Sequence, residues 1–315
     1  MWAFDESRPG GGADEAPGEG EGTFFEPHLV IPYFPGDTGT TGPGGKRDFP
    51  AGVIDYLCPS IKINGAPYNG APLPRNQTVS VTIEVANTKN KGMWAMVSLY
   101  WTDPTAVFTG NALHNGSDDA EVGPPQTLYV PAGGKASFNI TFTPLTKMPN
   151  HVCLLAEVTS SDDPAPGTFD VSDRHYACHN LNLLTVAQNR VSTINFFVAN
   201  PFDTEAEVLV RLRPEGDVEL AQLRRLYSTE PVRLREEAFR IHGVGDGRMR
   251  EAGRELTFPL AAGTRQLCQM LVSTNDLRAG QFSAVRVDQE VKQNPTDGTG
   301  ARRGSLGVVI FPERG

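Results

Sequence analysis

The feature that most constrains the fold is a strand–turn–strand pattern that occurs twice in the chain. In its first copy, residues 78–104, apolar side chains alternate with more polar ones on both sides of a polar turn that ends at Gly92. The apolar positions are Val79, Val81, Ile83 and Val85 before the turn and Ala95, Val97, Leu99 and Trp101 after it. A period of two places these side chains on one face of each strand, so the pattern predicts two antiparallel strands with one buried face.

The second copy, residues 192–214, repeats the pattern with a shorter turn. Aligning Asn87 with Asn200 places Val85 on Val198 and keeps the alternation on both sides of the turn. Beyond the turn, the four apolar positions of the first copy fall on Ala206, Val208, Val210 and Leu212. Self-similarity of a paired unit predicts two copies of one β fold in tandem.

Length and composition agree with this prediction. A chain of 315 residues is long enough for two domains, and its 33 glycines and 25 prolines favour many turns over long helices, which indicates an all-β class. The formal net charge of −9 argues against a surface that neutralises nucleic-acid phosphates. We therefore expect no nucleic-acid partner.

The strands are expected in two immunoglobulin-like sandwiches, residues 51–187 and 188–315. About seven short strands separated by turn signals are typical of such a sandwich, and in the first domain they include a hairpin at residues 128–142 and closing strands at 152–158 and 180–186. The second domain carries an insertion in which residues 217–227 have apolar positions near helical spacing and predict a short helix. Residues 231–253, rich in Arg and Glu, indicate a solvated loop or a second helix.

Residues 1–50 precede the sandwiches. Residues 1–22 are acidic and rich in glycine and predict a disordered tail, whereas residues 23–36 are apolar but interrupted by prolines. The prolines exclude a regular helix, so we expect an extended segment that contacts a domain surface or another molecule. The candidate partner-binding residues are Phe24, Phe25, Leu29, Ile31, Tyr33 and Phe34. Residues 37–50 indicate a flexible linker.

A family resemblance supports the sandwich prediction. Residues 151–158, 163–164 and 173–183 resemble the closing strands of bacterial immunoglobulin-like accessory domains of the cell-adhesion-related (CARDB-like) type, and residues 79–87 and 97–104 resemble their central strands. The resemblance spans residues 54–186 and extends only faintly into the second half. It implies a binding or spacing module without chemistry of its own, and it names no ligand.

The candidate chemistry is a cluster of thiols and imidazoles. Weak candidates for metal ligands are His151, Cys153, His175 and Cys178. Their spacing matches no familiar zinc module, and no oxyanion-stabilising loop accompanies them, so we predict buried inert cysteines, no metal, no cofactor and no enzyme. A Cys58–Cys153 disulfide is conceivable only in an oxidising compartment.

The N-terminus lacks the basic-then-apolar pattern of an export signal, and no apolar run is long enough to span a membrane. We expect a cytoplasmic protein with free thiols, or one released by a route without a signal peptide. Thus the oligomeric state and the compartment stay open.

Two functions from different classes are compatible with these patterns. The first is a structural or protein-interaction role, in which sandwich edges and the N-terminal extended segment bind a protein partner or a second copy. The alternative is a small-ligand or glycan-binding module that uses the loop at residues 108–126 and the aromatic pair Tyr100 and Trp101. A cysteine or metal-dependent hydrolase is the third hypothesis.

Overall fold

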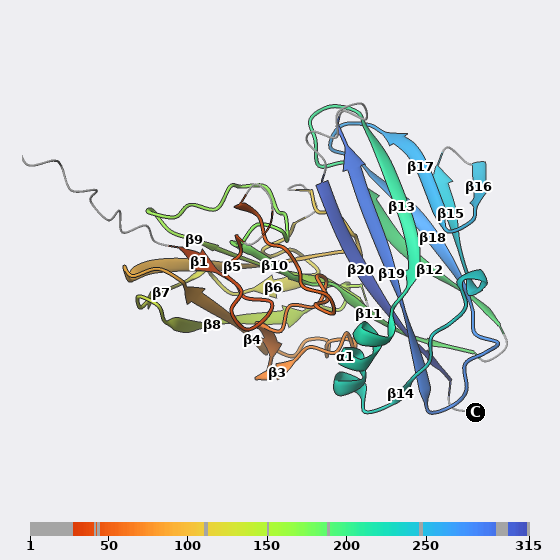
Figure 1. The fold of residues 1–315 in the computed structure, drawn as a ribbon, viewed down its shortest axis with the longest axis horizontal. Coiled ribbons are helices and arrows are strands. Elements are labelled where there is room, and N and C mark those ends of the chain that lie inside the picture. Colours follow the sequence, from red (N-terminus) through yellow and green to blue (C-terminus); the bar gives the residue numbers. More distant parts are fainter. Residues whose placement is uncertain are drawn as a thin grey trace, which may run out of the picture.

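The computed structural model describes residues 28–40, 42, 45–109, 113–149, 151–187, 190–245, 248–293 and 302–313. This part of the chain is mostly β and forms two sandwiches of antiparallel strands, with one α-helix (Figure 1). The predicted all-β class is confirmed. The predicted disordered tail, residues 1–22, lies outside the described residues, and no described helix has the length and apolar content needed to cross a membrane.

The first sandwich has two facing sheets. One sheet has the strand order β3 (Ala66–Pro67), β2 (Ile61–Ile63), β4 (Val79–Asn87), β8 (Lys135–Pro144), β6 (Ala120–Val122), with β1 (Leu29–Val30) also paired to β4. The other has the order β10 (Tyr176–His179), β9 (Cys153–Thr159), β5 (Met93–Thr102), β7 (Gln126–Val130). The alternating apolar residues of β4 and β5 all face the space between the sheets and are buried there.

The second sandwich has the same plan. One sheet runs β11 (Leu181–Val186), β20 (Arg302–Pro312), β19 (Gln281–Lys292), β13 (Ala206–Pro214), β17 (Glu255–Leu260), with β14 (Glu230–Pro231) paired to β19. The other runs β12 (Val191–Ala199), β18 (Arg265–Ser273), β15 (Phe239–Gly245), β16 (Arg248–Ala252). A helical turn at Glu236–Ala238 precedes β15. The region of residues 231–253 is therefore largely strand, and the expected loop or second helix there is wrong.

The two copies of the strand–turn–strand pattern occupy equivalent places. The order β9-β5-β7 of the first sandwich corresponds to β19-β13-β17 of the second, and β4-β8 corresponds to β12-β18. The aligned asparagines make the same turn contacts, because the side-chain amide of Asn87 donates to the carbonyl of Lys91 at 2.6 Å and that of Asn200 donates to the carbonyl of Thr204 at 2.8 Å. The repeated topology agrees with the predicted tandem duplication.

The pairing of neighbouring strands differs from expectation. The predicted hairpin at residues 128–142 is wrong, since β7 pairs with β5 while β8 pairs with β4 in the facing sheet. The strands β4 and β5 likewise lie in different sheets. Each buried face needs a facing partner about 10 Å away, and a turn of a few residues is long enough to cross that space.

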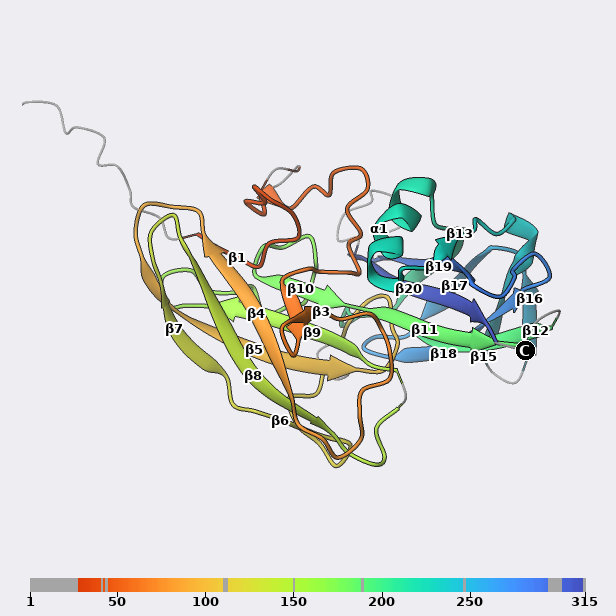
Figure 2. The same ribbon diagram turned by 90° about the horizontal axis from the view of Figure 1, so that it is seen from below.

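The two sandwiches are joined without a linker. Asn180 alone separates β10 from β11, and β11 pairs in parallel with β20 of the second sandwich (Figure 2). The expectation that residues 180–186 close the first sandwich is therefore wrong. Helix α1 (Asp217–Tyr227) confirms the predicted helix and buries Leu220 and Leu223 against the junction. The cluster there comprises Ile54, Tyr56, Leu181, Leu220, Leu223, Phe282, Ala284 and Val309.

Candidate functional site

The described part of the predicted partner-binding segment, residues 28–36, packs on the first sandwich of its own chain. Leu29, Ile31 and Tyr33 lie in the core of the first sandwich, and Phe34 packs partly buried against it. Leu29 and Val30 pair with Asn87 and Ala86 as strand β1. The sequence predicts that the segment contacts a domain surface or another molecule. For these residues the structure shows contact with a domain surface. Phe24 and Phe25 lie outside the described residues.

A buried arginine holds this segment in place. The Nε atom of Arg47 lies 2.9 Å from Asp37 Oδ2 in an ion pair with both side chains fully buried, and its Nη2 donates to the carbonyl of Ile31 at 3.0 Å. The guanidinium also lies 4.8 Å from the centroid of the Tyr33 ring, within the range of a cation–π contact. Residues 37 and 47 lie in the stretch expected to be a flexible linker, and that expectation is wrong at these two positions because the buried ion pair fixes them to the core.

A second polar group fixes the start of β1. Asp163 Oδ2 accepts the backbone N–H of Leu29 at 2.7 Å, and its Oδ1 lies 3.2 Å from His175 Nε2. His175 Nδ1 lies 2.8 Å from Asp173 Oδ1, so the imidazole stands between two carboxylates. Burial lowers the pKa of His175, but the bonds to the two carboxylates outweigh it and the pKa lies above its usual value. The two carboxylates therefore favour the protonated form of His175.

The four weak metal candidates do not meet at one point. Cys153 Sγ lies 4.0 Å from His151 Nε2, whereas Cys178 contacts the Tyr33 hydroxyl and His175 belongs to the carboxylate group above. Within the described ranges no three His, Cys, Asp or Glu side chains are placed to hold a metal. Burial raises the thiol pKa of Cys153 and Cys178 and lowers the pKa of His151 to about 3. A neutral thiol is a poor nucleophile, and an imidazole whose pKa is lowered this far is a weak base.

The aromatic pair expected to bind a glycan is largely internal. Trp101 is 2% exposed in the first core, and Tyr100 packs half-buried against a cluster around Phe108 and Cys153. Residues 110–112 of the predicted binding loop lie outside the described part of the chain.

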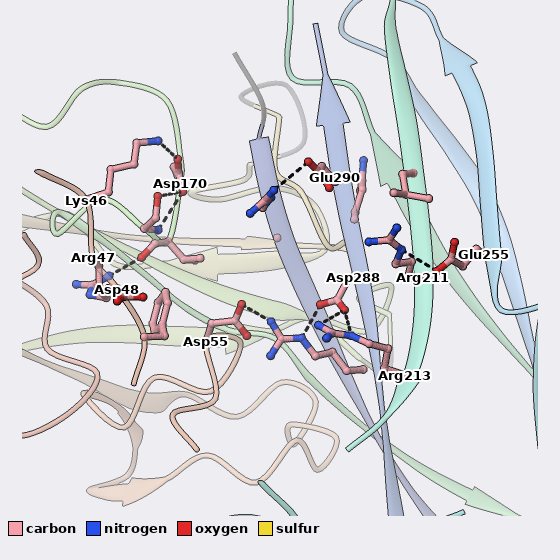
Figure 3. A pocket seen from close by; sticks show the side chains of 18 residues that line it. Lys46, Arg47, Asp48, Asp55, Asp170, Arg211, Arg213, Glu255, Asp288 and Glu290 are labelled. Carbon is pink, nitrogen blue, oxygen red and sulfur yellow. Dashed lines mark hydrogen bonds and ion pairs between the residues drawn. The ribbon is translucent and has the colours of Figure 1, made fainter. Parts of the chain in front are cut away.

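A charged cleft lies between the sandwiches. Figure 3 shows Lys46, Arg47 and Asp170 on one wall and the β13–β19 face with Arg211 and Asp288 on the other. The cleft has a volume of about 900 Å³, and its lining carries six basic and six acidic side chains. Most of these charges are paired across the cleft or along the sheet. The pairs are Lys46–Asp170, Arg211–Glu255, Arg213–Asp288, Arg286–Asp55 and Arg303–Glu290, at 2.5–3.1 Å. Balanced pairs leave no excess charge to select an ionic ligand.

Four apolar side chains are exposed on β5 and β7, namely Trp94, Met96, Leu128 and Tyr129. In this order they are 66%, 40%, 41% and 51% exposed. Trp94, Met96 and Tyr129 share the outer face of the sheet and form what we call the Trp94 patch, and Leu128 lies next to it at the edge of the inner face. Trp94 and Tyr129 are directly opposite in the antiparallel register, and their rings meet edge to face with centroids 5.8 Å apart. Figures 1 and 2 both show β7 on the side of the first sandwich away from the second. The alternation does not reveal the patch, because Trp94 and Met96 lie at positions of β5 that the pattern assigns to the polar, solvent-exposed face.

The strand β7 is a free sheet edge. It is the terminal strand of its sheet, and its sequence QTLYV has no charge and no proline, which are common ways to protect an edge. Leu128 is opposite the buried Ala95 and so belongs to the inner face, yet it is 41% exposed. No described strand pairs with the free edge of β7. The main-chain groups on this edge are placed to pair with an added strand.

The chain resembles known proteins only in architecture. No family model matches it, and no curated protein matches it. Among solved structures, PapD-like domain 7 of human CEP192 matches 43% of this chain and 82% of its own with 11% identity and a TM-score of 0.25. The calcium-binding domain CBD12 of CALX1.1 matches 69% and 76% with 13% identity and a TM-score of 0.20. The Enterococcus faecalis protein ACE matches 80% and 94% with 10% identity and a TM-score of 0.20.

These matches are immunoglobulin-like or PapD-like β-sandwiches, at identities and TM-scores too low to assign a family or a function. The strand order of the chain itself defines its class, a tandem β-sandwich protein. The CARDB-like resemblance stays a prediction.

Proposed function

We propose that the chain is a non-catalytic assembly protein that binds an extended polypeptide segment along β7 and over the Trp94 patch. The observation that carries this proposal is Leu128, an inner-face residue left 41% exposed because the sheet ends at β7. A segment that adds to this edge would pair with the main chain of β7 and bury Leu128. Main-chain pairing of this kind is β-augmentation, in which pockets for alternate side chains give specificity.

The patch supplies the apolar contact that such a complex needs. Exposed aromatic residues gathered on adjacent strands mark interaction surfaces more often than scattered single residues do. Trp and Tyr contribute disproportionately to binding energy at interfaces, so Trp94 and Tyr129 are the expected hot spots. Val191 and Val218, the other strongly exposed large apolar side chains in the described chain, lie on β12 and α1 and have no such neighbours.

The rest of the molecule suits a structural role. The four cysteines are buried, most of the cleft charges are paired, and the sandwiches are joined by a continuous backbone and a shared apolar cluster. A CARDB-like module without chemistry of its own would agree with this proposal.

The solution mass tests the proposal. Full-length protein is measured by size-exclusion chromatography with light scattering at several concentrations, beside the double variant Trp94→Ser/Tyr129→Ser. The wild type is expected to associate and the variant to be monomeric, because serine removes the apolar contact from positions that are already exposed. The matched control is Val191→Ser/Val218→Ser, which is expected to associate like the wild type. Association that survives the patch substitutions contradicts the proposal.

A further inference from the structure

We infer that the segment that adds to β7 is residues 23–27 of a second copy of this chain. The inference rests on the proposed function, since it names the partner of the same edge. Four features carry it: where the described chain begins, the residues of the segment, its charge, and the direction of β7.

The described chain begins at the end of the sandwich that holds the patch. The backbone N–H of Thr88 donates to the carbonyl of His28 at 3.0 Å, and the turn at residues 88–92 leads directly into β5 and Trp94. The turn that follows β7 lies at the same end, because the N–H of Gly133 donates to the carbonyl of Lys89 at 2.8 Å. Residues 1–27 therefore attach at the same end of the sandwich as the patch, on the side where β1 lies against β9, and β7 is the second strand beyond β9.

The sequence Thr23-Phe-Phe-Glu-Pro27 matches both faces of the edge. Successive side chains of a strand point to opposite faces, so Phe24 and Phe25 would cover one face each. One ring would pack on Trp94 and Tyr129 at the outer face, and the other on Leu128 at the inner face. Pro27 cannot donate to a ladder and would end the added strand.

The charges of the two partners are opposite. Residues 1–27 contain seven acidic side chains and one basic side chain, Arg8. The turn beside Trp94 carries the exposed residues Lys89 and Lys91, and Lys91 is half exposed in its 3.1 Å pair with Asp162. Attraction between such exposed charges is weak and screened by salt, so it orients the segment more than it holds it.

The direction of β7 favours a second copy over the same chain. β7 runs from Gln126 toward the end where His28 lies, since Val130 is opposite Met93 at the start of β5. A segment that runs directly into its own His28 would lie parallel to β7. Every pair in the two sheets of the first sandwich is antiparallel, and antiparallel pairs are slightly more stable per residue. A second copy can donate the segment antiparallel, and reciprocal donation closes a two-fold dimer.

The test uses the full-length variant Phe24→Ser/Phe25→Ser with Trp2→Ser/Phe4→Ser as its matched control from the same region. The dissociation constant is measured by light scattering and analytical ultracentrifugation, and amide hydrogen exchange is followed in residues 126–130. The variant is expected to weaken the dimer at least about tenfold and to speed exchange in β7, and the control is expected to behave like the wild type.

The outcomes for the two double variants together distinguish a failure of this inference from a failure of the proposed function. Association that is lost in the Trp94/Tyr129 variant but kept in the Phe24/Phe25 variant overturns the inference and leaves the proposed function standing. Association kept in both overturns both. Protection of residues 126–130 in a monomer, independent of concentration and lost in the Phe24/Phe25 variant, overturns the second copy in favour of the chain's own segment.

Discussion

Among single residues, Arg47 holds residues 31–37 against the first sandwich. Its guanidinium is fully buried, is paired with Asp37 at 2.9 Å, and donates to carbonyls of Ile31 and Val171 on two different segments. A buried arginine is tolerated only when its donors are satisfied, and here three chain segments supply the acceptors. The residue therefore links residues 31–37 to the loop before β10.

The substitution Arg47→Met should strongly destabilise the fold. It keeps much of the side-chain volume but leaves Asp37 as an uncompensated buried charge, and breaking such a pair costs about 3–5 kcal/mol of unfolding free energy. Urea denaturation at pH 7 measures the loss. The control Arg303→Met removes a pair whose arginine is 77% exposed, and it should change stability by no more than about 1 kcal/mol. Equal effects of the two substitutions would show that Arg47 does not fix the segment.

The sequence contains no signal for this residue. Residues 37–50 are rich in glycine and threonine, which are typical of a linker, and a buried ion pair has no periodicity that a pattern could reveal. The same holds for His175, whose two carboxylate partners are Asp163 and Asp173. Contacts between residues far apart in the chain depend on the fold and are visible only once the fold is known.

Among the secondary-structure elements, Asn180 fixes the connection between β10 and β11. Its side-chain Nδ2 donates to the carbonyl of Thr105 at 2.6 Å and to that of Ser305 at 2.9 Å, and the residue is fully buried. Its backbone N–H donates to the carbonyl of Tyr56 at 2.8 Å. One amide group therefore satisfies acceptors from both sandwiches at the point where the chain changes sheet.

The isosteric substitution Asn180→Asp should cost several kcal/mol. An aspartate offers no N–H to the two carbonyls, and each buried acceptor left without a donor costs about 1–3 kcal/mol. Thermal and urea unfolding measure the loss, with Asn139→Asp on the exposed face of β8 as the control that should stay near the wild type. A variant as stable as the control would mean that water or a rearranged neighbour replaces the amide.

The elements themselves were largely predictable, whereas their pairing was not. Alternation predicts many of the strands, although not β15 and β16, and α1 is expected at residues 217–227, where acidic residues begin the helix and basic residues end it, as the helix dipole favours. A short turn, however, is compatible with a hairpin or with a crossing between facing sheets. The choice depends on which faces are buried, so β7 and its exposed edge could not be placed from the sequence.

At the scale of the whole molecule, the junction between the sandwiches contains a buried acid. Tyr56 of the first sandwich donates its hydroxyl to Glu215 Oε1 of the second at 2.5 Å. Its ring packs on β20 at Gly307, where a side chain would collide with it. Asp55 pairs with Arg286 at 2.7 Å beside this contact. The two sandwiches are thus joined by a group whose charge depends on pH.

This group predicts how the junction responds to pH. Burial raises the pKa of Glu215 to about 7, although the Tyr56 hydrogen bond and Arg286 act in the opposite direction. A folded-state pKa above the unfolded value means that the folded protein binds the proton more tightly. The stabilisation is therefore complete below about pH 4.5 and is lost as pH rises through about 7.

The variant Glu215→Gln should remove this dependence. Glutamine imitates the protonated acid and still accepts the Tyr56 hydroxyl, so the unfolding free energies of variant and wild type should be similar near pH 5. At pH 8 the variant should be more stable by about 3 kcal/mol, the free energy that corresponds to such a pKa shift. Urea denaturation across this range measures the difference, and taking the difference cancels the other titrating groups. The control Glu207→Gln, at an exposed position on β13, should follow the wild type at every pH. A Glu215→Gln curve parallel to that of the wild type would contradict a buried, protonatable acid at the junction.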